Sequence, residues 1–326
     1  MYNSLIIKKM KKFLLSAITI IATGTFVSCN QNVDGLDNSN PNIKKEVYFT
    51  SNITKVELPS TRMSGITWDA SDSIGIFMFK KTTTTVVEGK SNIKYTTASG
   101  GETGAFLPAN EIIFFPDNGD EVRFMSYYPY TSGVSTTYNV DVSDQTNQPA
   151  IDLLYCFADT VFYDKTTNSD KKVSLVFNHK LTKININIRP GDGLVNSDIA
   201  NTVVMFEGFN TKANFDLVTG GLSGLNDVKI ITPLKMTTAE SGYTVSFESI
   251  IIPVDDPSST RIVFDLKNGD EGQQINSDLF TWKFSTEELK SGFEYIYNVT
   301  VKRSGIIVDA IIKEWEDGGH KDIDAE

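Results

Sequence analysis

Short runs of alternating apolar and polar residues recur along this chain from Val47 to Trp315. The clearest of them is Phe293–Lys302, in which every second residue is aromatic or branched apolar up to Val301. A period of two residues is the repeat of a half-buried β-strand, and turn-forming residues separate such strands about every eight to twelve residues. The sequence therefore predicts an all-β fold. A capping-box spacing predicts one short helix, over Ser285–Leu289.

The distribution of the predicted strands indicates two β-sandwiches in tandem. Each half carries about seven short strands, as such sandwiches do, and the polar segment Lys165–Lys172 is the best candidate for a linker. We therefore expect an N-terminal β-sandwich domain over residues 47–165 and a C-terminal β-sandwich domain over residues 166–326. Ile74–Phe79 is apolar on both faces, which is typical of a strand buried on both sides.

Two local patterns add detail to this outline. Residues 131–150 are mostly polar and are predicted to form a long surface loop with a small strand in it. The parity of the apolar positions changes between Leu181 and Ile184, and a shift of this kind in a period-2 pattern predicts a β-bulge near Thr182 and Lys183.

The N-terminal segment has the layout of a secretory signal peptide. Four lysines within Lys8–Lys12 precede the apolar run Leu14–Cys29, which is shorter than the roughly 20 residues that a membrane-spanning helix needs. Met10 is an alternative start, and an uncleaved anchor is the alternative to cleavage. We expect residues 1–28 to be removed, residues 29–46 to form a flexible linker, and the remainder to lie outside the cytoplasmic membrane.

The end of that segment, Phe26-Val27-Ser28-Cys29, resembles a bacterial lipobox, in which the cysteine becomes the lipidated first residue. Phe26 stands where the pattern usually has leucine. The resemblance implies a lipid on Cys29, which leaves Cys156 as the remaining thiol and allows no internal disulfide. Cys156 lies in an apolar run and is expected to be a buried small side chain rather than a nucleophile.

The charge balance and the titratable residues exclude several functions. Without residues 1–28 the chain has 26 basic and 41 acidic residues, so it repels phosphate backbones and nucleic acid is not an expected partner. The two histidines, His179 and His320, are far apart, and no clustered His and Cys ligands occur. Paired carboxylates such as Asp69 with Asp72 are typical of solvated turns. We therefore expect no enzyme, no cofactor and no metal site.

Several segments, in their order and spacing, resemble the fimbrillin-like proteins, the Mfa-like lipoproteins of Bacteroidales that are related to type V pilins. Besides the lipobox, the segments are Thr61–Arg62, Trp68–Met78, Phe124–Tyr130, Asp152–Tyr155, Phe177–Leu181 and Ile306–Trp315. The resemblance runs over residues 47 to 316 and implies that the two β-sandwich domains are transthyretin-like.

The resemblance also implies a route of assembly. A protease with Arg specificity cuts after the first strand, here at Arg62, and the strand Val47–Leu58 is lost. A C-terminal strand of a neighbouring subunit then enters the vacated groove, in the manner of strand addition. The matching donor is Ile306–Trp315, with Ile306, Val308, Ala310, Ile312 and Trp315 as its candidate residues. The alternative is that this strand completes its own sandwich.

Two functions follow from these observations. The first is a structural or accessory subunit of a type V fimbria, in a homo- or heteropolymer with other fimbrial subunits. The second is a stand-alone surface lipoprotein or tip adhesin that binds a glycan or host protein through loops such as 131–150. Trp68 and Trp282 are its candidate sugar platforms, although both are more typical of core residues. Both place the protein at the cell surface, held to the outer membrane through the lipid on Cys29.

Overall fold

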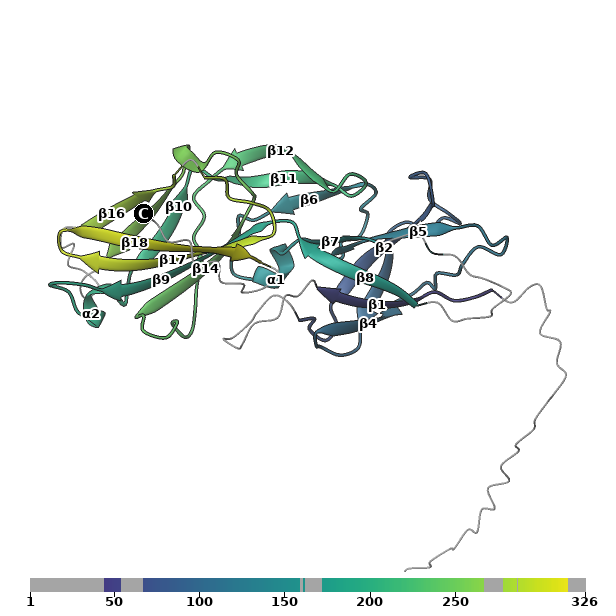
Figure 1. Ribbon diagram of the computed structural model, residues 1–326, viewed down its shortest axis with the longest axis horizontal. Coiled ribbons are helices and arrows are strands. Elements are labelled where there is room, and N and C mark those ends of the chain that lie inside the picture. The colour runs from purple at the N-terminus through teal and green to yellow at the C-terminus, as the bar shows by residue number, and fades with distance from the viewer. Residues whose placement is uncertain are drawn as a thin grey trace, which may run out of the picture. The chain divides into compact units, whose positions relative to one another are not determined.

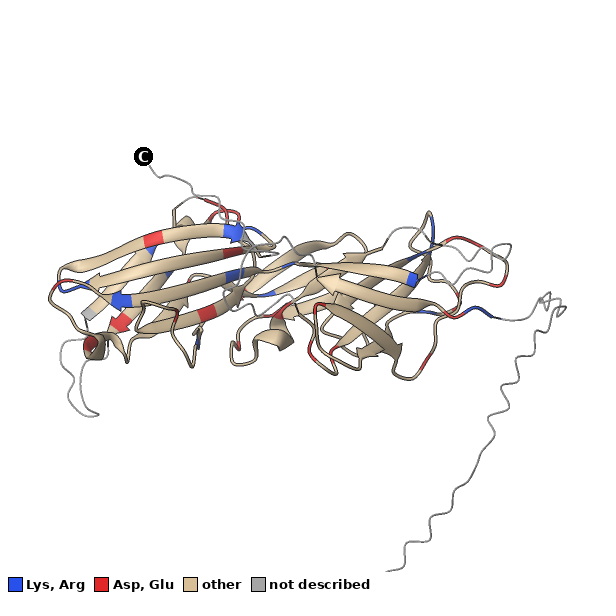
Figure 2. Ribbon diagram, turned by 60° about the horizontal axis from the view of Figure 1, so that its bottom comes forward, with Lys and Arg blue, Asp and Glu red and all other residues tan. Residues whose placement is uncertain are grey.

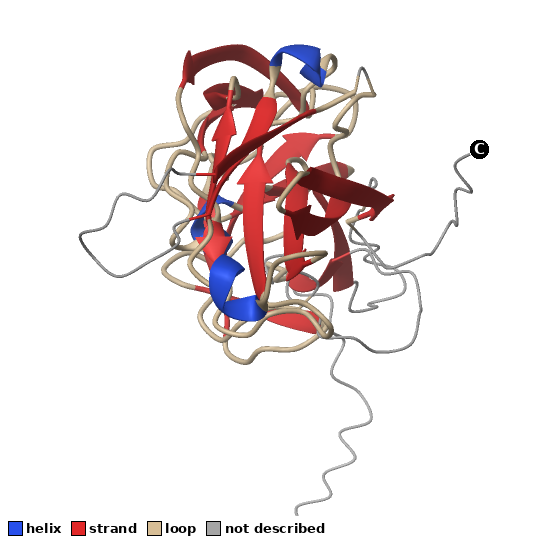
Figure 3. Cartoon of the chain, turned by 90° about the vertical axis from the view of Figure 1, so that its left-hand side faces the viewer, coloured by secondary structure: helices blue, strands red, loops and turns tan. Residues whose placement is uncertain are grey.

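The computed structural model of the protein describes residues 44–53, 67–158, 161, 172–266, 278–285 and 287–315. From Lys44 onward they belong to one compact unit. Its regular structure is almost all β-strand (Figure 3), and the helices among the described residues are α1 (Gln148–Ile151), α2 (Asn196–Ile199) and the 3-10 turn η1 (Pro257–Ser259). The prediction of an all-β fold is confirmed.

Seven strands form a closed barrel in the order β1-β4-β3-β2-β5-β7-β8 (Figure 1). They are β1 (Tyr48–Ile53), β2 (Ser73–Lys80), β3 (Ile93–Thr97), β4 (Thr103–Pro108), β5 (Val122–Tyr128), β7 (Leu154–Phe157) and β8 (Lys172–His179). Neighbouring strands are antiparallel, except that β1 runs parallel to β8. The barrel is therefore closed by the pairing of its first strand with its last.

Aromatic rings fill the interior of the barrel. Trp68 is only 1% exposed, and the rings of Phe106, Tyr128 and Phe177 meet it edge-on at centroid distances of 5.0, 5.6 and 5.2 Å. Edge-to-face contacts of this kind add to the stability that burial alone provides. Trp68 is thus a core residue, as expected of the two candidate tryptophans, and it is not available as a surface platform for a sugar.

Strand β2 separates two hydrophobic clusters. Ile74 and Ile76 belong to the cluster inside the barrel, whereas Phe77 and Phe79 belong to a cluster that continues into the second half of the chain. Successive side chains of a strand point to opposite faces, so a strand between two cores must be apolar on both. This confirms the expectation that Ile74–Phe79 is buried on both sides.

The second half of the chain, together with β6 from the first half, forms three open sheets. Their strand orders are β13-β14-β9-β17-β18, β10-β15-β16 and β12-β11-β6. The strands are β6 (Thr137–Asp141), β9 (Thr182–Pro190), β10 (Val203–Glu207), β11 (Asn210–Asp216), β12 (Gly221–Val228), β13 (Leu234–Lys235), β14 (Val245–Ile251), β15 (Arg261–Leu266), β16 (Asp278–Lys283), β17 (Phe293–Lys302) and β18 (Gly305–Glu314). Ile184, Ile186 and Ile188 of the central strand β9 are fully buried in the shared core.

The segment 131–150 is more structured than the sequence predicts. It contains β6, which lies between β5 and β7 in the sequence but is not a strand of the barrel. β6 instead pairs with β11 in the second half. Gln145 then donates from Nε2 to the carbonyl of Ile250 (2.9 Å) and accepts from its backbone N–H (2.9 Å). This excursion ties the two halves together, because its hydrogen bonds run to strands of the other half.

The chain crosses between the halves again after β8. β8 closes the barrel and ends at His179, and β9 begins at Thr182 in the five-stranded sheet. The predicted bulge near Thr182 and Lys183 is wrong, since β9 pairs with β14 in continuous register from Thr182 to Ile188. The parity of apolar positions changes because the chain passes from one sheet to another. The predicted boundary at residue 165 separates β8 from the barrel that it closes, and the division into two domains stays a prediction.

The short helix predicted over Ser285–Leu289 is also wrong. Ser285 and residues 287–289 are not helical, and Leu289 instead forms an isolated β-bridge with Val254. Leu289 is 2% exposed and packs in the core of the second half. A local capping pattern has been overridden here by the burial of an apolar side chain against a distant segment.

Candidate functional site

The sequence-predicted site residues fall partly inside the described structure. Cys29 and Arg62 lie outside the described residues, as do residues 54–58 of the strand expected to be released. The described part of that strand is β1, and the expected donor Ile306–Trp315 is β18 together with the residue that follows it. The structure therefore bears on how these two strands are held.

Strand β1 is paired along both edges. It matches β8 in parallel from Tyr48 to Ile53 and β4 in antiparallel from Phe49 to Asn52. Just before the strand, Val47 donates its backbone N–H to the carbonyl of Ile113 (2.9 Å). Because β1 lies between β4 and β8, its removal would open the barrel at one place and leave two strand edges unpaired.

The inward face of β1 fills the barrel. Val47, Phe49, Ser51 and Ile53 are 1%, 3%, 2% and 4% exposed. The ring of Phe49 packs edge-on against Tyr95 at 5.1 Å and against Phe124 at 5.0 Å. Loss of the strand would therefore expose a row of apolar pockets, the kind of surface that a second strand with alternating apolar residues can fill.

Tyr95 packs against Phe49 of β1 and brings a hydroxyl group into this part of the barrel core. Its hydroxyl oxygen accepts a hydrogen bond from the backbone N–H of Ile113 (2.9 Å), next to the segment that pairs with the start of β1. Burial raises the pKa of Tyr95 to about 12. The side chain therefore stays neutral at physiological pH. Sequence reasoning did not find it, because a tyrosine in an alternating strand carries no signal of this contact.

The barrel is tightly packed at Ser51, which faces Gly104 of β4. A Cβ atom on Gly104 would lie 3.0 Å from Ser51 Oγ, 3.0 Å from Trp68 Cδ1 and 2.7 Å from Phe106 Cε2. Neither Ser51 Oγ nor Trp68 Nε1 has a hydrogen-bond partner among the described residues. The site is thus tight and apolar, and it gains nothing from the hydroxyl of Ser51.

Strand β18 is the edge of its own sheet. It pairs with β17 over ten residues, from Phe293–Glu314 to Lys302–Gly305. Ile306, Val308 and Ile312 are half-buried against the core of the second half, while Ala310 is exposed. In this structure β18 therefore completes its own sheet, and β17 is its only paired neighbour among the described strands.

Trp315, the residue that follows β18, packs against a residue of β8 in the barrel. Trp315 is 5% exposed, and its ring stacks on His179 of β8 with centroids 4.0 Å apart and planes 12° apart. His179 Nδ1 lies 2.9 Å from Asp152 Oδ1, and the backbone N–H of Trp315 donates to the carbonyl of Gly292 (2.6 Å). His179 is a buried structural residue here, in contact with a candidate residue of the donor strand.

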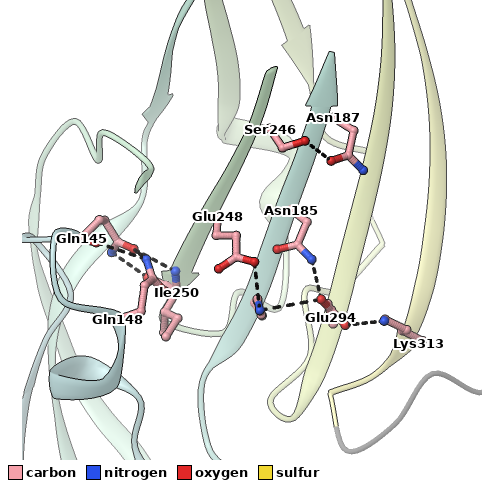
Figure 4. Close-up of polar contacts among 10 residues, drawn as sticks. Gln145, Gln148, Asn185, Asn187, Ser246, Glu248, Ile250, Glu294 and Lys313 are labelled. Carbon is pink, nitrogen blue, oxygen red and sulfur yellow. Dashed lines mark hydrogen bonds and ion pairs between the residues drawn. The ribbon is translucent and has the colours of Figure 1, made fainter. Parts of the chain in front are cut away.

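A row of charged side chains crosses the five-stranded sheet on the face away from the core (Figure 4). Lys183 of β9 lies 3.4 Å from Glu248 of β14 and 3.9 Å from Glu294 of β17, and Lys313 of β18 lies 2.7 Å from Glu294. Asn185 donates a further hydrogen bond to Glu294. The Lys183 side chain is only 8% exposed, and buried charges persist only where they are paired. The row joins four strands and reaches β18 through Lys313.

Acidic and basic residues are interspersed over the strands of both halves rather than gathered by sign (Figure 2).

Trp282, the second candidate sugar platform, is partly buried, and its ring centroid lies 4.8 Å from that of Tyr297. Within the described ranges, no helix is long and apolar enough to span a membrane.

Fold and site together define an all-β protein whose first and last described strands are held by ladder pairing and side-chain packing. Residues 61–315 match the sequence model of the family described as fimbrillin-like. The chain belongs to the fimbrillin-like family, so the predicted family is confirmed.

Individual relatives agree with this assignment. The chain is 34% identical over 263 residues to a candidate fimbrium subunit, Fim1C, of Bacteroides uniformis, covering 79% of this chain and 82% of that protein. Among solved structures, it is similar to a candidate cell adhesion protein of Bacteroides uniformis, with a TM-score of 0.66 and 30% identity over 83% of this chain and 98% of the other. A candidate cell adhesion protein of Bacteroides ovatus shares the fold, with a TM-score of 0.62 and 23% identity over 84% and 98% of the two chains.

Proposed function

We propose that this protein is a structural or accessory subunit of a type V fimbria. It is exported as a lipoprotein with its lipid on Cys29, cut at Arg62, and assembled by exchange of β1 for a C-terminal strand of another subunit. Its partners are other fimbrial subunits and, through the lipid, the outer membrane. The family and the relative named as a candidate fimbrium subunit support a fimbrial role at the cell surface. The role is structural rather than catalytic.

The observation that carries the proposal is the placement of β1. It closes the barrel through six residue pairs with β8 and four with β4, while its alternate side chains fill the core. A second strand of the same pattern can restore both the ladder and the packing. Exchange therefore replaces β1 by another strand with the same alternation of side chains. The main-chain hydrogen bonds of the new ladder hold the two subunits together.

The position of β18 supports its assignment as the donor. An edge strand can leave its sheet without breaking a second ladder, and one that presents apolar residues at its edge is prone to pair with another chain. Ile307 is 48% exposed on this strand. In its own sheet, β18 is held by its ladder with β17, the Lys313–Glu294 ion pair and the stack of Trp315 on His179.

The test uses soluble protein with Cys29 removed, treated with an Arg-specific protease and followed by intact mass and by unboiled denaturing gels. We expect one cut at Arg62 and then a ladder of heat-labile, detergent-resistant multimers. The matched control is Arg62→Ala, which should give neither the cut nor the ladder. Removal of residues 306–326 should keep the cut and abolish the ladder.

Two other outcomes would change the assignment. A cut at Arg62 without multimers would favour an anchor or tip component that needs the strand of a different subunit. Complete resistance at Arg62 would contradict the maturation step. The better interpretation would then be a stand-alone surface lipoprotein or tip adhesin that binds a glycan or a host-surface protein.

A further inference from the structure

The side chains that β1 turns into the barrel differ in size. In chain order they are Val47, which directly precedes the strand, and Phe49, Ser51 and Ile53 of the strand itself, so the third pocket holds a small residue and the others hold large ones. The third pocket is small because of what surrounds it. Ser51 faces Gly104, and the space above Gly104 is already occupied by Ser51 Oγ and by the rings of Trp68 and Phe106.

Ser51 is 2% exposed, and a larger side chain at its position would extend into the space beside Gly104, where the rings of Trp68 and Phe106 already lie. An incoming strand is therefore expected to place a small residue there, because a large one would force the tightly packed rings around it to move. A hydroxyl is not required, since neither Ser51 Oγ nor Trp68 Nε1 has a hydrogen-bond partner among the residues that the structure describes. Alanine fits this pocket as well as serine does.

Strand β18 has the same size pattern. Its alternate residues Ile306, Val308, Ala310 and Ile312 are large, large, small and large in the direction of the chain. Laid over β1 in the same direction, they place Ala310 at the position of Ser51. The strand would then run parallel to β8 and antiparallel to β4, as β1 does.

Other registers fail on size or charge. A shift by two residues along the groove brings Val308 or Ile312 into the pocket of Ser51. A shift by one residue turns Asp309 inward. Insertion in the reverse direction with Ala310 in the small pocket places Glu314 at the position of Val47, which is 1% exposed. A buried carboxylate without a partner is strongly unfavourable.

We propose that β18 of a second copy of this chain occupies the β1 groove in the direction of β1, with Ala310 in the pocket of Ser51 and Gly104. This inference rests on the proposed function and adds to it the partner, the direction and the register. The pocket selects a single register, because it accepts only one small residue of the donor.

The structure offers a way to test the register without disturbing the fold. Ala310 is exposed in its own sheet, where it lies opposite Tyr297 of β17. A larger residue at this position therefore leaves the free subunit intact. It meets an obstacle only when β18 enters the groove of another copy.

The experiment compares Ala310→Leu with Ala310→Ser in the soluble full-length chain without Cys29, treated with the Arg-specific protease. We expect the serine variant to form the ladder of multimers as the wild type does, and the leucine variant to lose at least tenfold in multimer yield. Circular dichroism and the thermal midpoint of the uncut proteins should be the same for both.

Cross-linking gives a second readout. In the proposed register Ile311 replaces Asn52, which lies beside Val176 of β8, whereas Asp309 replaces Thr50, two residues away. Neighbouring strands allow a disulfide, but an offset of two residues along the strand separates the Cα atoms by about 8 Å, beyond the reach of a disulfide. The double variant Val176→Cys with Ile311→Cys should form disulfide-linked multimers, and Val176→Cys with Asp309→Cys should not.

The outcomes separate the register from the function on which it rests. Wild-type protein that is cut at Arg62 but forms no multimers would overturn donation of β18 by a second copy and leave an accessory subunit that takes the strand of a different subunit. Complete resistance at Arg62 would overturn the maturation step on which both proposals rest. Equal ladders from the leucine and serine variants, or efficient cross-linking through residue 309 instead of residue 311, would overturn the register and leave strand exchange standing. Loss of the ladder in the leucine variant together with cross-linking at residue 311 would establish the proposal.

Discussion

At the scale of single residues, the contact between Ser51 and Gly104 is one of the tightly packed places of the barrel. A glycine there lets β1 and β4 approach while Trp68 and Phe106 fill the space above it. The constraint is steric rather than conformational, because Gly104 does not have a positive φ. The fit of β1 in the barrel thus depends on the absence of one side chain on the neighbouring strand.

Replacing Gly104 by alanine should therefore destabilise the protein. The new Cβ would lie within 3.0 Å of three neighbouring side chains, two of which are buried rings. We expect a loss of about 1–3 kcal/mol in the free energy of unfolding, as for other overpacked cores. The control is Gly221→Ala in β12, where the nearest atom to the new Cβ is Thr219 Oγ1 at 3.6 Å. Urea unfolding of both variants checks this, and an equal effect would contradict the steric argument.

At the scale of elements, β18 is held by more than its ladder. The ion pair of Lys313 with Glu294 belongs to the row of charges that also contains Lys183 and Glu248. Because the Glu294 side chain is only 12% exposed, its contacts are less screened by water than those of a surface pair. The row ties the register of β18 to three other strands.

The variant Lys313→Ala should lower the free energy of unfolding by about 1–3 kcal/mol, the usual range for losing a hydrogen bond to a charged group. Lys302→Ala is the matched control on the same hairpin. Lys302 lies 3.1 Å from Asp192, whose side chain is 91% exposed, and exposed pairs of this kind contribute about 0–1 kcal/mol. Thermal and urea unfolding measure both, and equal losses would show that the row does not hold β18.

The elements also show what sequence reasoning can and cannot reach. Local alternation predicted β17 over Phe293–Lys302, and the apolar run at Ile74–Phe79 predicted a strand between two cores. Pairing between distant segments was out of reach. Nothing local in residues 137–141 indicates that they join β11, and a capping pattern at Ser285–Leu289 could not reveal the bridge of Leu289 to Val254.

The candidate site was predictable to the same degree. The apolar residues of β1 and β18 indicated that both segments are strands, and the resemblance to the family implied that they exchange. The pocket of Ser51 had no sequence signal, because its size depends on Gly104, Trp68 and Phe106, which lie far along the chain. A small residue in an alternating strand is informative only once its neighbours across the sheet are known.

At the scale of the whole molecule, buried tyrosines make the fold sensitive to alkali. Burial raises the pKa of Tyr95 to about 12 and also raises the pKa values of Tyr127, Tyr155 and Tyr297. The unfolded chain releases these protons near the ordinary pKa of 10, so the folded state holds protons that the unfolded state has lost. The stabilisation is fully present below pH 10 and is lost as the pH rises through the folded pKa values.

We therefore expect the free energy of unfolding to be constant between pH 8 and about pH 9.5 and to fall steadily from pH 10 upward. Urea unfolding followed by tryptophan fluorescence at several pH values measures this fall. The absorbance of tyrosinate, recorded alongside, should show a group of tyrosines that titrates only as the protein unfolds. Full titration of every tyrosine near pH 10 in the folded protein would contradict the prediction.

The excursion of β6 has a mechanical consequence for a subunit in a fibre. In the fibre that we propose, tension that enters the barrel through an exchanged strand in the β1 groove does not reach the second half through the covalent connection after β8 alone. It is also carried by the ladder of β6 with β11, five residue pairs long, and by the hydrogen bonds of Gln145 with Ile250. In such a fibre we expect the load to be shared between a covalent connection and a sheet, so that the two halves respond to tension together.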